Sequence, residues 1–138
     1  MNNPAQRMNI PPAIASANNF PETDWQTLLA NSVTSANQLT DHLAVDRAAI
    51  ERVTSRYPMR INPYTLALIR QHGEPLQRQA VPCKEELYTD DGQQDPLHEE
   101  RQSPVNGIIH RYPDRVVFLV SNRCAVYCRF CMRKRQVG

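Results

Sequence analysis

Three cysteines fall within one short segment near the end of this 138-residue chain, Cys124-Ala-Val-Tyr-Cys128-Arg-Phe-Cys131. Thiolates are soft metal ligands, and three of them on one loop can converge on a single metal centre. A [4Fe–4S] cluster has four irons, so three protein thiolates leave one iron open to a further ligand. The spacing C-x3-C-x2-C therefore favours an iron–sulfur site, and it constrains the fold more than any other feature.

Two other uses of these cysteines compete with the iron–sulfur site. A zinc site would add a histidine such as His110 to the three thiolates in a closed tetrahedral shell. Zinc knuckles and ribbons usually hold their ligands as two separated pairs, whereas these three cysteines share one loop. A disulfide framework fits less well, because three clustered thiols cannot all pair with one another. The isolated Cys83 and the lack of a secretory signal favour a reduced, cytoplasmic chain.

Length and composition indicate one ordinary globular domain. Hydrophobic residues make up 41% of the chain and charged residues 22%, which is typical of a water-soluble protein. The sequence contains no apolar run of about 18 residues, so we expect neither a membrane-spanning helix nor a membrane partner.

The net charge of +2 hides a strong asymmetry along the chain. Residues 111–138 hold seven Lys or Arg residues and the single acid Asp114, a balance of +6, whereas residues 1–110 have a balance of −4. No nucleic-acid motif or run of interleaved aromatic residues accompanies the basic end, so we expect no nucleic-acid partner. Arginine forks also suit the phosphates and carboxylates of small ligands, which is the interpretation we favour.

The chain begins with an expected flexible tail, residues 1–22, followed by a helical lobe at 23–73. Four helix starts carry capping signals. They are Thr23 with Gln26, Ser35 with Gln38, Asp46, and Asn62 before Pro63. Gly73 is placed to end the last helix. Apolar stripes are expected to form the core, with Trp25 among them.

Beyond the lobe, residues 74–110 predict an extended connection, because Pro75, Pro82 and Pro96 and an acidic stretch interrupt them. Lys84–Leu87 is expected to form one helical turn, and Ser103–Gly107 a chain reversal at Asn106-Gly107. The β-branched run Val116–Val120 predicts a fully buried strand of a parallel sheet. The cysteine loop follows its carboxyl end, where α/β barrels carry their chemistry. The fold class is therefore α/β, with residues 111–138 as the start of a truncated barrel.

Several motifs occur together and in order, and their combination resembles the lysine 2,3-aminomutase family of radical S-adenosylmethionine enzymes. In the second half they are Asp95–His98, Ser103–Gly107, His110–Arg115 and Cys124–Arg135. In the first half they are Asp24–Gln26, Pro58-Met59, Asn62–Tyr64 and Arg78–Pro82. The likeness extends over roughly residues 23–138. It implies that the expected barrel is a radical S-adenosylmethionine barrel, of which the first strand and the cluster loop are present.

The resemblance implies an enzyme that moves an amino group from the α- to the β-carbon of an amino acid. Its cofactors would be a [4Fe–4S] cluster, S-adenosylmethionine and pyridoxal phosphate. The matching cluster ligands are Cys124, Cys128 and Cys131. The position near the adenine of S-adenosylmethionine is Phe130, and the positions for the pyridoxal phosphate group are Arg111, Tyr112 and Arg115. The position for the substrate carboxylate is Arg133.

Two departures from the family pattern affect substrate and activity. Lysine aminomutases generally carry histidine where this chain has Phe130, and related enzymes act on glutamate, on arginine or on a lysine of a translation factor. The lysine that holds pyridoxal phosphate is missing, since Lys84 and Lys134 match no such position. A complete barrel takes about 250 residues. We therefore expect an N-terminal fragment that is inactive alone, from a family whose full-length members form homo-oligomers. The alternative is a non-catalytic remnant that binds iron–sulfur or zinc.

Overall fold

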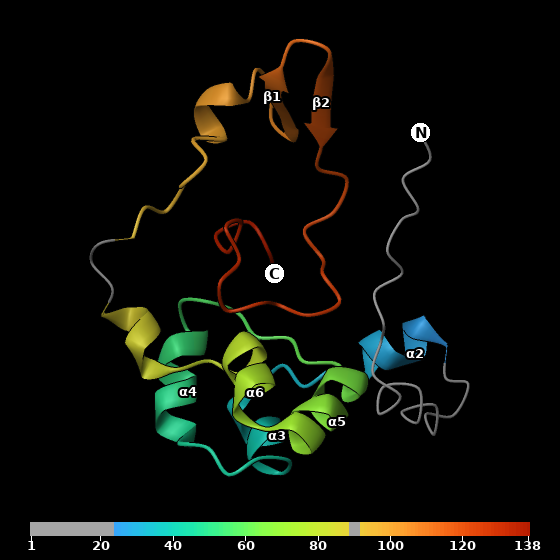
Figure 1. Ribbon diagram of the computed structural model, residues 1–138, viewed down its shortest axis with the longest axis vertical. Coiled ribbons are helices and arrows are strands. Elements are labelled where there is room, and N and C mark those ends of the chain that lie inside the picture. Colours follow the sequence, from blue (N-terminus) through green and yellow to red (C-terminus); the bar gives the residue numbers. More distant parts are fainter. Residues whose placement is uncertain (1–23, 89–91) are drawn as a thin grey trace, which may run out of the picture.

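The computed structural model describes residues 24–88 and 92–138 and consists of a helical lobe, a hairpin and an irregular C-terminal segment (Figure 1). The expected tail at residues 1–22 and the expected cap Thr23 lie outside the described residues. The helices of the lobe are α2 (Trp25–Ala30), α3 (Ala36–Thr40), α4 (Arg47–Thr54), α5 (Pro63–His72) and α6 (Glu74–Ala80). Within these described parts, no helix is long and apolar enough to cross a membrane.

Three of the predicted helix starts are confirmed, each by a side chain that accepts a hydrogen bond from a free backbone N–H. Ser35 and Gln38 form the reciprocal capping box of α3. Asp46 caps α4, and Asn62 caps α5 with Pro63 in the first turn. Such caps stabilise a helix by about 1 kcal/mol each. Gly73 ends α5 as predicted, with a φ of 71° that a residue with a side chain rarely adopts.

The first helix differs from its prediction. Its N-cap is Asp24, whose carboxylate accepts a hydrogen bond from the Thr27 backbone nitrogen at 2.9 Å. None of the six described residues of α2 is buried, and Trp25 is 65% exposed. Placing Trp25 in the core was therefore wrong, because a helix of this length turns only part of its surface towards the lobe.

The core of the lobe comes from the apolar stripes of α3, α4 and α5, as expected. A short antiparallel bridge between Val33 and Ile61 closes it, with backbone hydrogen bonds of 2.8 and 3.0 Å. The buried cluster comprises Val33, Ala36, Leu39, Ile50, Met59, Ile61, Leu66, Ile69, Ala80 and Val81. The last two members lie beyond the predicted end of the lobe at residue 73.

The extended connection predicted from residue 74 is wrong at its start, because α6 follows Gly73 directly. Pro75 lies in the first turn of α6, where a missing backbone N–H costs nothing, so this proline accompanies a helix start. Further on, the predicted turn at Lys84–Leu87 is present as the 3-10 helix η2, and a second one, η3, spans Glu100–Gln102. The division into four segments remains a prediction.

The strand prediction is wrong in its pairing and its burial. Strand β1 (Ile108–Tyr112) pairs antiparallel with β2 (Arg115–Phe118) to form a hairpin, and the described residues contain no parallel pairing. The turn before it is confirmed, since Gly107 has a φ of 83°. All of β2 is exposed, and Phe118 is 65% exposed. A continuous apolar run does not reveal how many neighbours a strand has, and here it has one. The described architecture is thus mixed helix and strand, and the barrel stays a prediction.

Candidate functional site

The cysteine loop is irregular and leads from the hairpin back to the helical lobe (Figure 1). The Cys131 backbone nitrogen donates to the Cys128 carbonyl oxygen at 3.2 Å, so these two cysteines share one turn, which we call the 128–131 turn. Cys124 is exposed outside this turn, while Cys128 and Cys131 are half-buried and all three are free thiols. The donor chemistry fits a thiolate-bound cluster. Within residues 24–88 and 92–138, however, no three Cys, His, Asp or Glu side chains are gathered closely enough to hold a metal ion.

The loop is fixed to the lobe by backbone contacts on both sides of Cys128. The Tyr127 backbone nitrogen donates to the Arg60 carbonyl oxygen at 3.1 Å, and that of Arg129 donates to the Gln79 carbonyl oxygen at 2.9 Å. The Tyr127 ring is buried, with the Arg60 guanidinium 5.5 Å from its centroid. These contacts join segments far apart in the sequence, so the helical lobe determines where the 128–131 turn lies.

A buried ionic network reinforces this attachment. Both carboxylate oxygens of Glu86, on η2, accept hydrogen bonds from Arg129, with the shortest at 2.7 Å from Nη2. Lys134 donates to the same carboxylate and to the Arg129 carbonyl oxygen. The side chains of Glu86 and Arg129 are only 10% and 5% exposed. Burial by itself raises the pKa of Glu86, but the hydrogen bonds from Arg129 and Lys134 outweigh it and hold this pKa below its ordinary value.

Four of the predicted ligand-binding residues meet in one pocket of about 350 Å³ between the hairpin and the segment after the last cysteine. These four are Arg111, Tyr112, Arg115 and Arg133. The other residues lining the pocket are Leu97, Glu99, Ile109, Val116 and Val117. The pocket therefore has an apolar wall from the hairpin and a rim of guanidinium groups, a combination suited to an anion attached to an apolar body.

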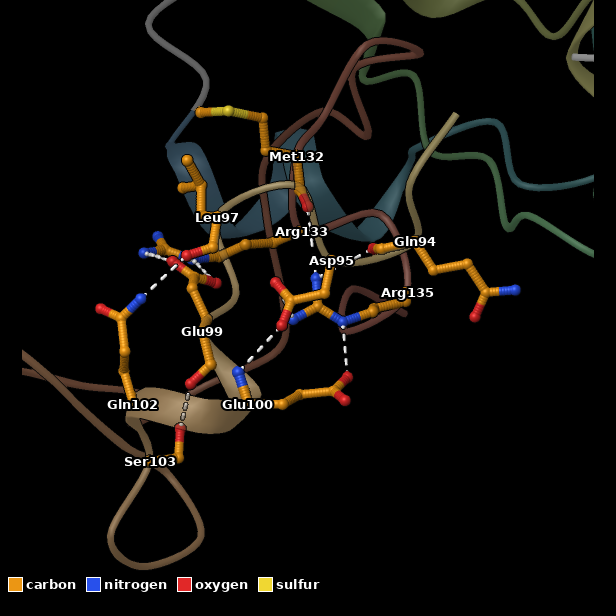
Figure 2. Close-up of polar contacts among 10 residues, drawn as sticks. All are labelled: Gln94, Asp95, Leu97, Glu99, Glu100, Gln102, Ser103, Met132, Arg133 and Arg135. Atoms are coloured by element: carbon orange, nitrogen blue, oxygen red, sulfur yellow. Dashed lines mark hydrogen bonds and ion pairs between the residues drawn. The ribbon is translucent and has the colours of Figure 1, made fainter. Parts of the chain in front are cut away.

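Two of these arginines already have carboxylate partners. Arg133 binds the buried Glu99 through Nε and Nη2, with distances of 3.1 and 2.7 Å to Oε1 (Figure 2). The hydrogen bond to Glu99 raises the pKa of the Arg133 guanidinium. Arg115 pairs with the adjacent Asp114 in the turn of the hairpin. Both Arg111 and Arg115 lie over the Tyr112 ring, at 5.9 and 5.8 Å from its centroid.

The remaining predicted site residues lie elsewhere in the described part of the chain. Phe130 is exposed, and neither it nor the three cysteines are among the residues that line this pocket. The structure thus brings together the predicted phosphate and carboxylate positions, and it leaves the cluster ligands and the adenine position apart from them. The assigned roles of all these residues remain predictions.

Sequence reasoning missed the acidic partners of the basic segment. Besides Glu86 and Glu99, the carboxylates of Asp95 and Glu100 contact Arg135, each at 3.0 Å (Figure 2). The charge asymmetry was the available signal, because an acidic first part and a basic last part attract each other. We interpreted the arginines as ligand-binding groups, although several of them bind this chain's own carboxylates.

Comparison with known proteins relates the chain to an enzyme family. No family model matches the chain. Curated L-lysine 2,3-aminomutases do match it: that of Bacillus subtilis is 40% identical over 121 residues, and that of Methanococcus maripaludis 38% over 133 residues. The resemblance to the lysine 2,3-aminomutase family is confirmed.

These two matches cover 83% and 90% of this chain but only 26% and 30% of the aminomutases themselves. The glutamate 2,3-aminomutase of Clostridioides difficile is 33% identical over 133 residues, which is 91% of this chain and 32% of that protein. The chain therefore spans about a third or less of the length of the aminomutases it matches. Relatives named for two different amino acids match similar shares of it.

Proposed function

We propose that this chain is the cluster-binding and anion-binding part of a radical S-adenosylmethionine, pyridoxal phosphate-dependent amino acid 2,3-aminomutase. The observation that carries the proposal is the pocket in which Arg111, Tyr112, Arg115 and Arg133 meet. These residues come from a hairpin and from the segment after Cys131, which are separated in the sequence. Together with the aminomutase relatives, this pocket favours an enzyme that holds two anionic groups side by side.

One end of the pocket suits a phosphate group. Arg111 lies on β1 and Arg115 on β2. Both guanidinium groups lie over the ring of Tyr112, so they are held close to one phenol. Phosphate oxygens accept several charge-assisted hydrogen bonds at once, which two guanidinium groups and a hydroxyl can donate. We assign this end to the phosphate of pyridoxal phosphate.

The other end suits a carboxylate. The hydrogen bonds of Arg133 to Glu99 use its Nε–Nη2 edge. The second edge of the guanidinium, formed by Nη1 and Nη2, has the fork geometry that binds a carboxylate with two hydrogen bonds. We assign this edge to the carboxylate of an amino acid substrate.

The thiolates of Cys124, Cys128 and Cys131 would bind three irons of a [4Fe–4S] cluster and leave the fourth open. When bound, the reduced cluster would supply the electron that cleaves S-adenosylmethionine to a radical, and pyridoxal phosphate would hold the amino group that moves. The exposed ring of Phe130 is available to stack on the adenine. The names of the first relatives favour lysine as the substrate. Glutamate, arginine or a lysine of a translation factor are the alternatives.

Turnover by this chain alone is not expected. Its two lysines are Lys84 and Lys134, and the second is bound to Glu86 in the buried network, so it is not free to hold pyridoxal phosphate. In the complete enzyme we expect a cytoplasmic homo-oligomer that acts on an amino acid substrate, with neither a nucleic acid nor a membrane as partner.

Anaerobic reconstitution of the 138-residue chain with iron and sulfide tests the proposal. We expect a broad visible absorption that dithionite bleaches, and an altered electron paramagnetic resonance signal of the reduced cluster when S-adenosylmethionine is added. Cys128→Ala should remove both signals, and Cys83→Ala is the matched control that should keep them. Uptake of stoichiometric zinc with no uptake of iron would refute the proposal and support the non-catalytic zinc-binding alternative.

A further inference from the structure

The strongest long-range attachment of the cysteine loop is made by Glu86, a residue that lies 43 positions before Arg129. Its Oε1 accepts from Arg129 Nε at 3.0 Å and from the Cys83 backbone nitrogen at 2.9 Å. Its Oε2 accepts from Arg129 Nη2 at 2.7 Å and from Lys134. One carboxylate thus receives donors from Cys83, the residue before η2, and from Arg129 and Lys134.

Each guanidinium nitrogen of Arg129 donates a hydrogen bond to an oxygen of this chain. Its Nε and Nη2 bind Glu86, and its Nη1 donates to the Pro58 carbonyl oxygen at 2.9 Å. The side chain leaves the loop directly after Cys128 and is buried against the lobe. Arg129 therefore attaches the 128–131 turn to the lobe at the residue that follows Cys128.

Lys134 fixes the chain on the other side of the same turn. It reaches Glu86 and the Arg129 carbonyl oxygen, and its ammonium group lies 4.3 Å from the centroid of the Tyr57 ring. The two basic residues that Glu86 binds therefore flank Cys131 in the sequence: Arg129 lies two residues before it and Lys134 three residues after it. Cys124 lies outside this arrangement.

We infer that Glu86 is a positioning residue for the iron–sulfur site: by binding Arg129 and Lys134 it fixes the 128–131 turn, so that Cys128 and Cys131 are presented together as thiolate ligands. This inference rests on the proposed function. Cluster assembly then brings Cys124 to two cysteines that already share a turn. Removing the carboxylate leaves the buried Arg129 and the half-buried Lys134 without their shared partner, so the attachment of the turn to the lobe weakens.

The test compares the unmodified chain with Glu86→Gln and Lys134→Met, using Glu74→Gln as the matched control. Glu74 forms an exposed pair with Arg78, so its change removes a carboxylate without touching the loop. The first readout is the rate at which iodoacetamide modifies each cysteine of the metal-free chain, followed by mass spectrometry. We expect Cys128 and Cys131 to react about tenfold faster in Glu86→Gln, less so in Lys134→Met, and Cys124 to change little.

The second readout is iron bound per chain after reconstitution and the rate at which a chelator removes it. We expect removal to be several-fold faster in Glu86→Gln and unchanged in Glu74→Gln. Hydrogen exchange of α3, α4 and α5, measured in parallel, should stay the same in every variant.

Unchanged rates at Cys128 and Cys131 in a folded Glu86→Gln chain would overturn the inference. Equal loss of protection in α3, α4 and α5 in both loop variants would overturn it too, because the network would then stabilise the whole lobe. Failure of the unmodified chain to bind iron refutes the proposed function, while the modification rates still decide whether Glu86 fixes the turn.

Discussion

The ion pair between Glu99 and Arg133 gives a sharp energetic prediction, because the neighbouring Glu100 is an internal control. Glu99 has a side chain that is 6% exposed, whereas that of Glu100 is 69% exposed. We expect Glu99→Gln to lower the free energy of unfolding by about 2 kcal/mol. Breaking a buried ion pair costs about 3–5 kcal/mol, because one charge is left uncompensated. We expect a loss below this range, about 2 kcal/mol, because the Arg133 side chain is 39% exposed and can turn towards water when its partner is removed.

Urea denaturation of the 138-residue chain measures this difference. A slope of about 1–2 kcal/mol per molar urea turns a loss of 2 kcal/mol into a midpoint lower by about 1–2 M. Glu100→Gln removes an exposed contact to Arg135 and should cost less than about 0.5 kcal/mol. Equal effects of the two substitutions would refute the reasoning, since burial is what distinguishes the two carboxylates.

Three further predictions concern the cluster, the hairpin and turnover. Alanine at Cys124, Cys128 or Cys131 should each abolish cluster formation, measured as iron per chain, while Cys83→Ala should leave it unchanged. Hydrogen exchange should be faster at residues 110–138 than in α3, α4 and α5, because β2 has one neighbour and is fully exposed; uniform protection in a monomer would contradict this. The reconstituted chain should form no β-amino acid from lysine, glutamate or arginine, and product that depends on Cys128 would show the expectation to be mistaken.

The local features of this fold were predictable and the long-range ones were not. A helix cap depends on residues three or four apart, so Ser35, Asp46 and Asn62 could be recognised in the sequence. The burial of Val116–Val120 depends on what packs against it, which a run of apolar residues does not contain. The error at Trp25 has the same origin.

The site divides in the same way. Motif order could indicate the thiolates and the arginines, and the pocket does gather Arg111, Tyr112, Arg115 and Arg133. Which acid pairs with which base depends on how the chain returns to the lobe after the hairpin. Glu86 and Arg129 lie in segments with no local signal for their pairing, so only the structure reveals that Arg129 is an attachment of the loop.

The pH dependence of stability offers a last check on the Glu86 network. The pKa of Glu86 is lowered from its ordinary value of 4.5 in the folded chain, because the hydrogen bonds from Arg129 and Lys134 outweigh the effect of burial. A carboxyl group whose pKa is lower in the folded state contributes stability above its unfolded pKa and loses that contribution as pH falls through the folded pKa. The difference in unfolding free energy between the unmodified chain and Glu86→Gln should therefore be constant from pH 7 to about 5 and shrink below about 4.5. Other carboxylates titrate alike in both chains and cancel in the difference. Urea denaturation at a series of pH values measures it, and a difference that persists undiminished at pH 3 would show that the charge of Glu86 does not stabilise the loop.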